Sequence, residues 1–199
     1  MLNVKPLRLV CLFTFLVIFM IAQAFGSPRD AGALPADSVY QLPISLTDQD
    51  GREFKLSDRR GQPMVVSMFY TSCQFVCPML IETLRATEAQ LSADERSRLT
   101  VLLVSFDPKN DTVTVLKRTA GERQVDTKRW ALARTDAKSV RKLAAVLGTQ
   151  YRELSNGDFN HSTSLVLLDA DGRIAAKTPR LGDADPAFVT QVHGVLAAH

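Results

Sequence analysis

MVVSMFYTSCQFVCP, residues 64–78, is the stretch that decides the fold. Its first seven residues, 64–70, form a dense apolar run, which is typical of a central strand covered on both faces. Pro78 suits the first turn of a helix, and apolar residues then recur at helical spacing, namely Leu80, Ile81, Leu84 and Leu91. The sequence therefore predicts a strand, a loop with two cysteines and a helix in direct succession.

Strand and helix signals continue to alternate after this stretch. Residues 100–106 predict a second buried strand, and Asp111 is the expected N-cap of the helix that follows. Residues 130–133 predict a shorter strand, and Asp136 is expected to cap another helix, which Gly148 ends. We expect residues 149–162 to form a polar loop.

Hairpins lie on both sides of this alternating region. Two of them, each with an Asp and Gly turn, are predicted at residues 42–46 with 53–56 and at residues 164–168 with 173–177. A last helix starts near Asp185. Because there is no internal repeat, we predict one α/β domain with a central mixed β-sheet, helices on both of its faces and an extra N-terminal β-hairpin.

The first residues resemble an export signal. Lys5 and Arg8 precede an almost unbroken apolar run over residues 9–24, which is short for a membrane span of roughly 20 apolar residues. We expect residues 1–24 to be a cleaved signal peptide or an N-terminal membrane anchor. Residues 25–38 are then a flexible linker, and residues 39–199 are the domain. Either outcome predicts a periplasmic domain, soluble or anchored to the inner membrane.

Composition narrows the class of partner. The chain is 46% hydrophobic and 23% charged, as a globular protein should be. Its net charge of +3 includes Lys5 and Arg8, so the exported part is close to neutral. No basic stripe interleaved with aromatic residues is present, which argues against nucleic acid as a partner. We expect a monomer.

Cys73 and Cys77 are the chemically interesting cysteines, because Cys11 lies in the apolar run and is expected to be only a small hydrophobe. The backbone N–H groups at a helix start favour thiolate over thiol. Helical residues four apart have Cβ atoms about 5–6 Å apart, against roughly 3.8 Å in a disulfide. Two thiolates on one metal, with bonds near 2.3 Å, hold their sulfurs nearly 4 Å apart. The spacing suits a metal without excluding a disulfide.

His161 is the best candidate for a third donor. We expect His193, inside the last helix, and His199, the last residue, to be solvated or packed side chains. His161 instead precedes a strand that should neighbour the strand leading to Cys73. Two thiolates and one imidazole favour copper, especially copper(I). Structural zinc needs four ligands, although a zinc site with two cysteines, one histidine and a water stays open.

Three separated motifs occur in a fixed order: Thr71-x-Cys73-x-x-x-Cys77-Pro78, Asp107-Pro108-x-x-Asp111-Thr112, and His161-Ser162 before a strand that ends Leu168-Asp169-x-x-Gly172. Over roughly residues 40–196 the chain thereby resembles the Sco/SenC family of copper chaperones for cytochrome oxidase assembly. The resemblance implies a thioredoxin-like fold, export, and copper bound by Cys73, Cys77 and His161. It also implies a partner, which is the copper-binding subunit of cytochrome oxidase or another exported copper protein.

The chain departs from the family pattern between its cysteines. Gln74-Phe75 stands where the family commonly has Pro-Asp, so a negative charge is lost and an apolar surface is gained. The recipient is therefore left open. An alternative is a thiol-disulfide oxidoreductase that reduces partner cysteines, in which Cys73 attacks and Cys77 resolves. We expect Asp107 and Asp111 to form a turn and a helix cap, not metal ligands.

Overall fold

Strand β3 (Met64–Phe69) lies in the interior of the sheet and is buried along its whole length. It pairs in parallel with β4 (Thr100–Ser105) and antiparallel with β8 (Leu165–Leu168). A strand with neighbours on both edges and cover on both faces has no solvated side, which explains the unbroken apolar run. This is a computed structural model, and it describes residues 32–73 and 75–198.

The remaining elements include the strands and helices expected from the sequence. They are η1 (Val39–Gln41), β1 (Ser45–Asp48), β2 (Glu53–Lys55), η2 (Leu56–Arg59), α2 (Val76–Ala89), α3 (Ala93–Arg98), α4 (Val113–Glu122), β5 (Trp130–Arg134), α5 (Ala137–Leu147), β6 (Tyr151–Glu153), β7 (Phe159–His161), β9 (Ile174–Thr178) and α6 (Pro186–Ala197). Of these, η1, η2, α3, β6 and β7 were not expected. The main sheet has the order β2-β1-β5-β4-β3-β8-β9, in which β3, β4 and β5 are parallel and the outer pairings are antiparallel.

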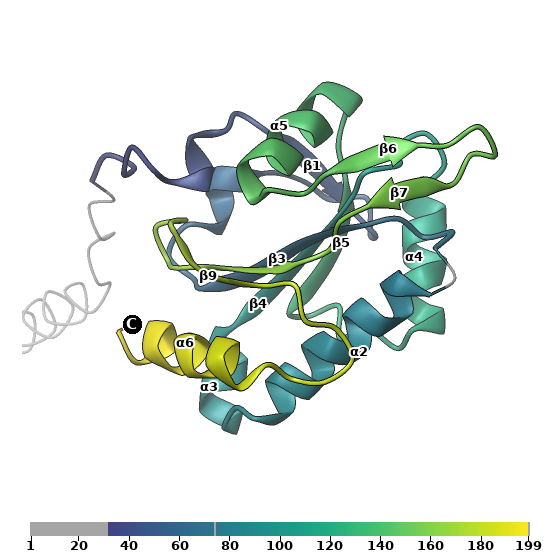
Figure 1. The fold of residues 1–199 in the computed structure, drawn as a ribbon. Coiled ribbons are helices and arrows are strands. Elements are labelled where there is room, and N and C mark those ends of the chain that lie inside the picture. The colour runs from purple at the N-terminus through teal and green to yellow at the C-terminus, as the bar shows by residue number, and fades with distance from the viewer. Residues whose placement is uncertain (1–31, 74, 199) are drawn as a thin grey trace, which may run out of the picture. The chain divides into compact units, whose positions relative to one another are not determined.

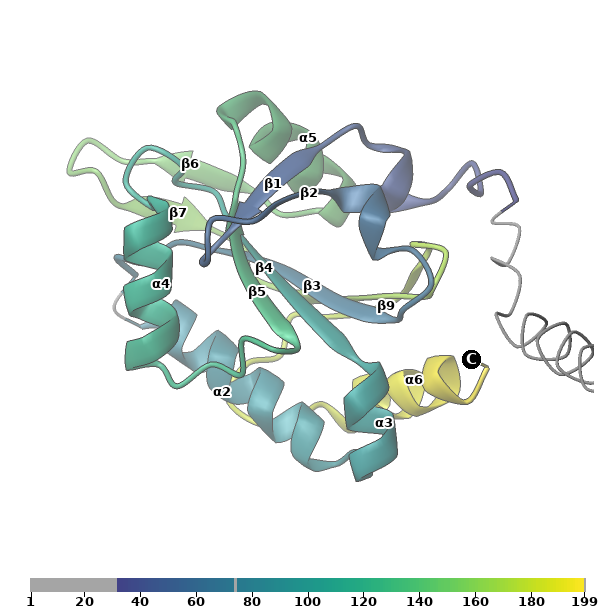
Figure 2. The same cartoon turned by 180° about the vertical axis from the view of Figure 1, so that it is seen from behind.

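Helices cover both faces of this sheet. Figures 1 and 2 show α2, α3 and α6 on one face and α5 on the other. The buried side chains of α2 and α6 include Leu80, Leu84, Val192 and Leu196, which join the core. The predicted central mixed β-sheet flanked by helices is therefore confirmed, and the N-terminal hairpin β1–β2 lies at one edge of it.

The chain before β1 packs against the β8–β9 turn. Ser38 is buried, and its hydroxyl donates to the carbonyl of Asp171 at 2.5 Å. Gly172 has φ +81°, and a Cβ there would lie 2.5 Å from the ring of Tyr40, so only glycine fits. Leu34 also packs on the core, and residues 34–199 form one compact unit.

The segment predicted as signal peptide or anchor, residues 1–24, lies outside the described residues. Residues 25–31 of the predicted linker also lie outside them. Within residues 32–73 and 75–198, no helix combines the length and the apolar character that a membrane crossing requires.

Two local expectations are wrong. Asp111 does not cap α4, because Thr112 is the N-cap and accepts a hydrogen bond from the Val115 amide. Residues 149–162 are not simply a polar loop, since they contain β6 and β7, which pair antiparallel as a separate two-stranded sheet. The helix start at Asp136 and the left-handed Gly148 that ends α5 agree with the prediction.

Candidate metal and thiol site

The two cysteines follow the central strand. Cys73 lies in the loop after β3, and Cys77 is the second residue of α2. Both are free thiols, with only 8% and 6% of their surface exposed. The loop turns tightly enough for the Cys73 amide to donate to the Tyr70 carbonyl at 3.4 Å. The apolar run therefore ends by delivering one thiol to the loop and one to the first helical turn.

The surroundings of the two sulfurs shift their pKa values in opposite directions. The pKa of Cys73 is lowered to about 4, mainly by a hydrogen bond from the Cys77 thiol and also by backbone N–H groups at the start of α2, against the opposing effect of burial. Cys77 is shifted the other way, because donating to Cys73 and being buried both raise its pKa. These opposite shifts favour one thiolate and one thiol in the pair near neutral pH.

Asp111 lies beneath this loop as a buried carboxylate. It accepts hydrogen bonds from the Thr71 amide at 3.1 Å, from the Thr71 hydroxyl, and from the Ser105 hydroxyl at 2.5 Å. Burial raises the pKa of Asp111, and its charge helps to raise the pKa of Cys77. Asp111 thus ties the start of the cysteine loop to the end of β4.

Tyr70 connects the cysteine loop with the β6–β7 hairpin. Its hydroxyl donates to the carboxylate of Asp158, which immediately precedes β7, and it is also within hydrogen-bonding reach of Cys73. Its ring meets the imidazole of His161 edge-on, with 5.6 Å between centroids. The ring of Phe106 lies 5.0 Å from the same imidazole. His161 is therefore held in an aromatic cluster that borders the thiol pair.

The structure brings the two thiols into contact but does not place His161 on them. Across residues 32–73 and 75–198, no three His, Cys, Asp or Glu side chains come close enough to share a metal ion. The Nδ1 atom of His161 instead lies 3.0 Å from the Thr163 hydroxyl and 3.3 Å from the Ser162 carbonyl oxygen, within hydrogen-bonding distance of both. His193 pairs with Glu95 at 2.6 Å, so its ring is already engaged, and His199 lies outside the described residues.

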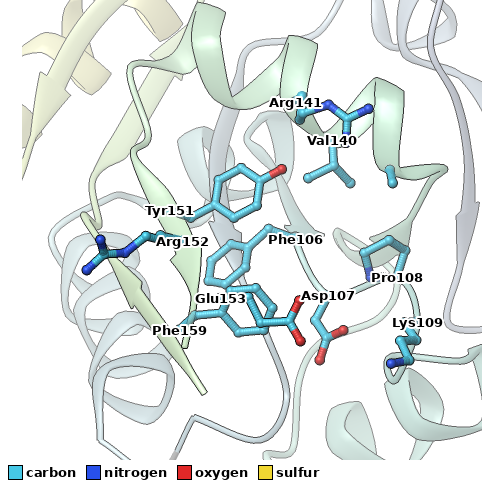
Figure 3. A pocket seen from close by; sticks show the side chains of 11 residues that line it. Phe106, Asp107, Pro108, Lys109, Val140, Arg141, Tyr151, Arg152, Glu153 and Phe159 are labelled. Atoms are coloured by element: carbon cyan, nitrogen blue, oxygen red, sulfur yellow. The ribbon is translucent and has the colours of Figure 1, made fainter. Parts of the chain in front are cut away.

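A cavity of about 450 Å³ is lined in part by aromatic side chains that pack next to His161, namely Phe106, Tyr151 and Phe159 (Figure 3). The rings of Phe106 and Tyr151 stack at 5.3 Å, and Phe159 packs edge-on against Phe106 at 5.2 Å. Its lining residues do not include Cys73, Cys77 or His161. This cavity is therefore not the entrance to the thiol pair.

Sequence reasoning did not single out Tyr70 or Asp158, and it gave Asp111 only a capping role. For Tyr70 a signal existed, because a residue with a polar hydroxyl ends an otherwise apolar strand directly before the first cysteine motif. Asp158 carries no comparable signal, and Asp111 was recognisable only as part of the second motif, since the roles of both come from contacts with residues 88 and 40 positions away in the chain.

A dithiol at the amino end of a helix, directly after the central strand of a mixed sheet with helices on both faces, defines a protein with the thioredoxin-like fold. Within that class the chain belongs to the SCO1/SenC family, whose model matches residues 33–196. The resemblance found in its three motifs is thereby confirmed.

Individual relatives are distant. The chain is 24% identical over 135 residues to a protein of Stutzerimonas stutzeri named "Putative copper-binding protein", covering 66% of this chain and 65% of that protein. It spans between 44% and 65% of the length of the curated relatives that it matches.

Solved structures share the fold. Yeast Sco1 with copper bound has a TM-score of 0.66 at 18% identity, covering 79% of this chain and 88% of Sco1. BsSco is described as having a disulfide switch and as a member of the Sco family of cytochrome c oxidase assembly proteins. It has a TM-score of 0.67 at 18% identity, covering 79% of this chain and 94% of BsSco.

Proposed function

We propose that this protein is a copper metallochaperone that takes up copper on Cys73, Cys77 and His161 and assists the assembly of a copper centre. The observation that carries the proposal is the reduced, nearly buried thiol pair with its sulfurs in hydrogen-bond contact. Such a contact matches the separation of about 4 Å that two thiolates on one metal require. Family membership and the copper-binding name of the Stutzerimonas stutzeri relative support copper as the cargo.

The donor set fits copper better than other metals. Two thiolates and one imidazole are soft to intermediate ligands, and copper(I) accepts three of them. Asp111 and Asp158 are engaged by Thr71, Ser105 and Tyr70, so neither carboxylate is free to serve as a hard ligand. Because His161 is held against Tyr70 and Phe106, copper uptake on all three donors requires His161 or the cysteine loop to shift.

For the recipient, we propose the copper-binding subunit of cytochrome oxidase or another exported copper protein, met in the periplasm. The support is family membership, the description of BsSco as belonging to a family of oxidase assembly proteins, and the basic and apolar pattern of residues 1–24. In this proposal residues 1–24 direct export as a signal peptide or an anchor, and residues 25–38 separate them from the domain.

Metal analysis of the purified, reduced protein tests this function. The wild-type protein is expected to retain one copper per chain after removal of free metal, and Cys73→Ser and His161→Ala are each expected to lose it. His193→Ala is the matched control, because His193 is also half exposed but pairs with Glu95. Equal copper uptake by wild type and His161→Ala would show that the proposed site is wrong.

A second function, thiol-disulfide exchange, is favoured by the opposite pKa shifts of the two cysteines. A stabilised Cys73 thiolate can attack a partner disulfide, and the neighbouring Cys77 can then resolve the mixed disulfide. Exchange does not need an imidazole. A disulfide reductase assay is therefore expected to show activity in His161→Ala and none in Cys73→Ser if exchange occurs, and inactivity of the wild-type protein would exclude it.

A further inference from the structure

Phe75 is unusually exposed for a large apolar side chain. It shows 81% of its surface to solvent, and Met79 shows 44%. The other large hydrophobic side chains in the described part of the chain show at most 39%. A single exposed apolar residue needs no explanation, but a phenylalanine that is almost fully solvated beside a reactive thiol pair does.

Phe75 and Met79 lie on one face of α2. Phe75 is the N-cap residue, and its carbonyl accepts from the Met79 amide, so the two side chains are one helical turn apart. The next exposed residue on this face is Glu82, which is paired with Arg85 at 2.7 Å. The apolar pair is thus confined to the end of the helix that carries the cysteines, and charge begins further along.

The position of Phe75 matters because the two thiols are difficult for another protein to reach. Cys73 and Cys77 are more than nine-tenths buried, so a donor atom from another protein can reach them only by close approach to the loop. Metal–thiolate bonds are about 2.3 Å long. The surface that carries the recipient's donor atoms must therefore come into van der Waals contact with the residues around Cys73 and Cys77. Phe75 lies between the two cysteines in the chain, and 81% of its surface is exposed to solvent.

We propose that Phe75, with Met79 beside it, is the specificity-determining contact for the protein that receives copper from Cys73 and Cys77. The recipient is an exported copper protein with an apolar recess next to its own metal-binding cysteines. This inference rests on the proposed function and adds to it the surface by which the recipient is chosen. Burial of one aromatic anchor is the usual energetic centre of such a contact.

The transfer leaves the oxidation state of copper unchanged. The bonds from copper(I) to the sulfurs of Cys73 and Cys77 and to the imidazole of His161 break as bonds to two cysteine sulfurs and a further donor atom of the recipient form. The protons of the recipient thiols pass to the released side chains or to water. No electron acceptor or donor is needed. The contact at Phe75 affects the docking of the two copper sites and takes no part in the transfer chemistry.

Two acceptors separate docking from chemistry. One is the reduced, metal-free copper-binding domain of the cytochrome oxidase subunit from the same organism, and the other is the small copper(I) chelator bathocuproine disulfonate. For Phe75→Ala, the second-order rate constant of transfer to the domain is expected to fall at least about tenfold, as for an interface hot spot. Transfer to the chelator is expected to stay unchanged.

Two further variants serve as controls. Val146→Ala removes a comparably apolar, 39% exposed side chain from α5 and is expected to change neither rate. Phe75→Leu keeps an apolar side chain and is expected to recover part of the transfer rate. If Phe75→Ala slows transfer to both acceptors alike, or to neither, the proposal is wrong. If the wild-type protein loads the chelator but not the domain, the assignment of the recipient is wrong.

Failure of the proposed function would appear separately, as absence of copper uptake by the wild-type protein. In that case the Phe75 contact is tested by the rate of thiol-disulfide exchange. The two acceptors are the oxidised form of the same domain and oxidised glutathione. Phe75→Ala is expected to slow only the reaction with the domain. An equal rate for wild type and Phe75→Ala would overturn the contact in this arm too.

Discussion

Cys73 and Cys77 carry the same functional group four residues apart, yet their surroundings shift their pKa values in opposite directions. The difference comes from position. Cys73 precedes α2, so the N–H groups of the first turn point toward its sulfur, whereas Cys77 lies inside the turn and donates its own proton to Cys73. A site that must bind a metal and release it to a partner benefits from one sulfur already ionised.

The Cys73 thiolate gives a pH-dependent signal. In the reduced, metal-free protein, thiolate ultraviolet absorbance is expected to persist from neutral pH downward and to disappear only as the pH falls through about 4, because the folded pKa lies below the ordinary value. Cys77→Ala removes the strongest cause of that shift, so its thiolate is expected to protonate at clearly higher pH. Loss of the wild-type signal at the same pH as in Cys77→Ala would contradict this account.

At the scale of elements, the N-cap of α4 is Thr112, one residue after the expected Asp111. Asp and Thr are both good helix caps, so the pair Asp111-Thr112 does not itself tell which residue caps α4. The choice is made by Thr71 in the cysteine loop and Ser105 at the end of β4, whose donors engage Asp111. Thr112 is left to cap the helix.

This division of roles predicts two separable effects. Thr112→Ala is expected to lower the free energy of unfolding by about 1 kcal/mol, the usual cost of a lost cap, without changing the reactivity of Cys73. Asp111→Asn places an amide NH₂ among donors from Thr71 and Ser105 and is expected to change the alkylation rate of Cys73 as well. Urea titrations and timed alkylation measure both quantities, and an unchanged alkylation rate in Asp111→Asn would show that it does not position the loop.

The elements themselves were largely predictable, since the apolar runs of β3 and β4 and the cap at Asp136 follow local rules. The pair β6–β7 was not predicted, although Asn156-Gly157 is a strong turn signal. Its strands have three residues each and alternate too briefly to outweigh a polar composition. The ring of Phe106, which directly follows β4, packs on rings from β6 and β7 and stabilises this hairpin, and those contacts have no local signature in the sequence.

At the scale of the whole molecule, the fold gathers residues from three separate segments around the thiols: Tyr70 and Cys73 in the first, Asp111 in the second, and Asp158 and His161 in the third. The sequence named both cysteines and His161, because thiols and imidazole are recognisable donors. It could not show that His161 rests on Tyr70 and Phe106 instead of on the sulfurs, because that depends on how the β6–β7 hairpin packs. The residues that hold the donors apart are apolar or aromatic, and they resemble ordinary core.

X-ray absorption at the copper edge of the reduced, copper-loaded protein tests the central claim most directly. The account predicts a three-coordinate copper(I) with two sulfur scatterers and one imidazole, and loss of the imidazole signal in His161→Ala but not in His193→Ala. Copper bound by sulfur alone in the wild-type protein, or an imidazole signal that survives in His161→Ala, would contradict it.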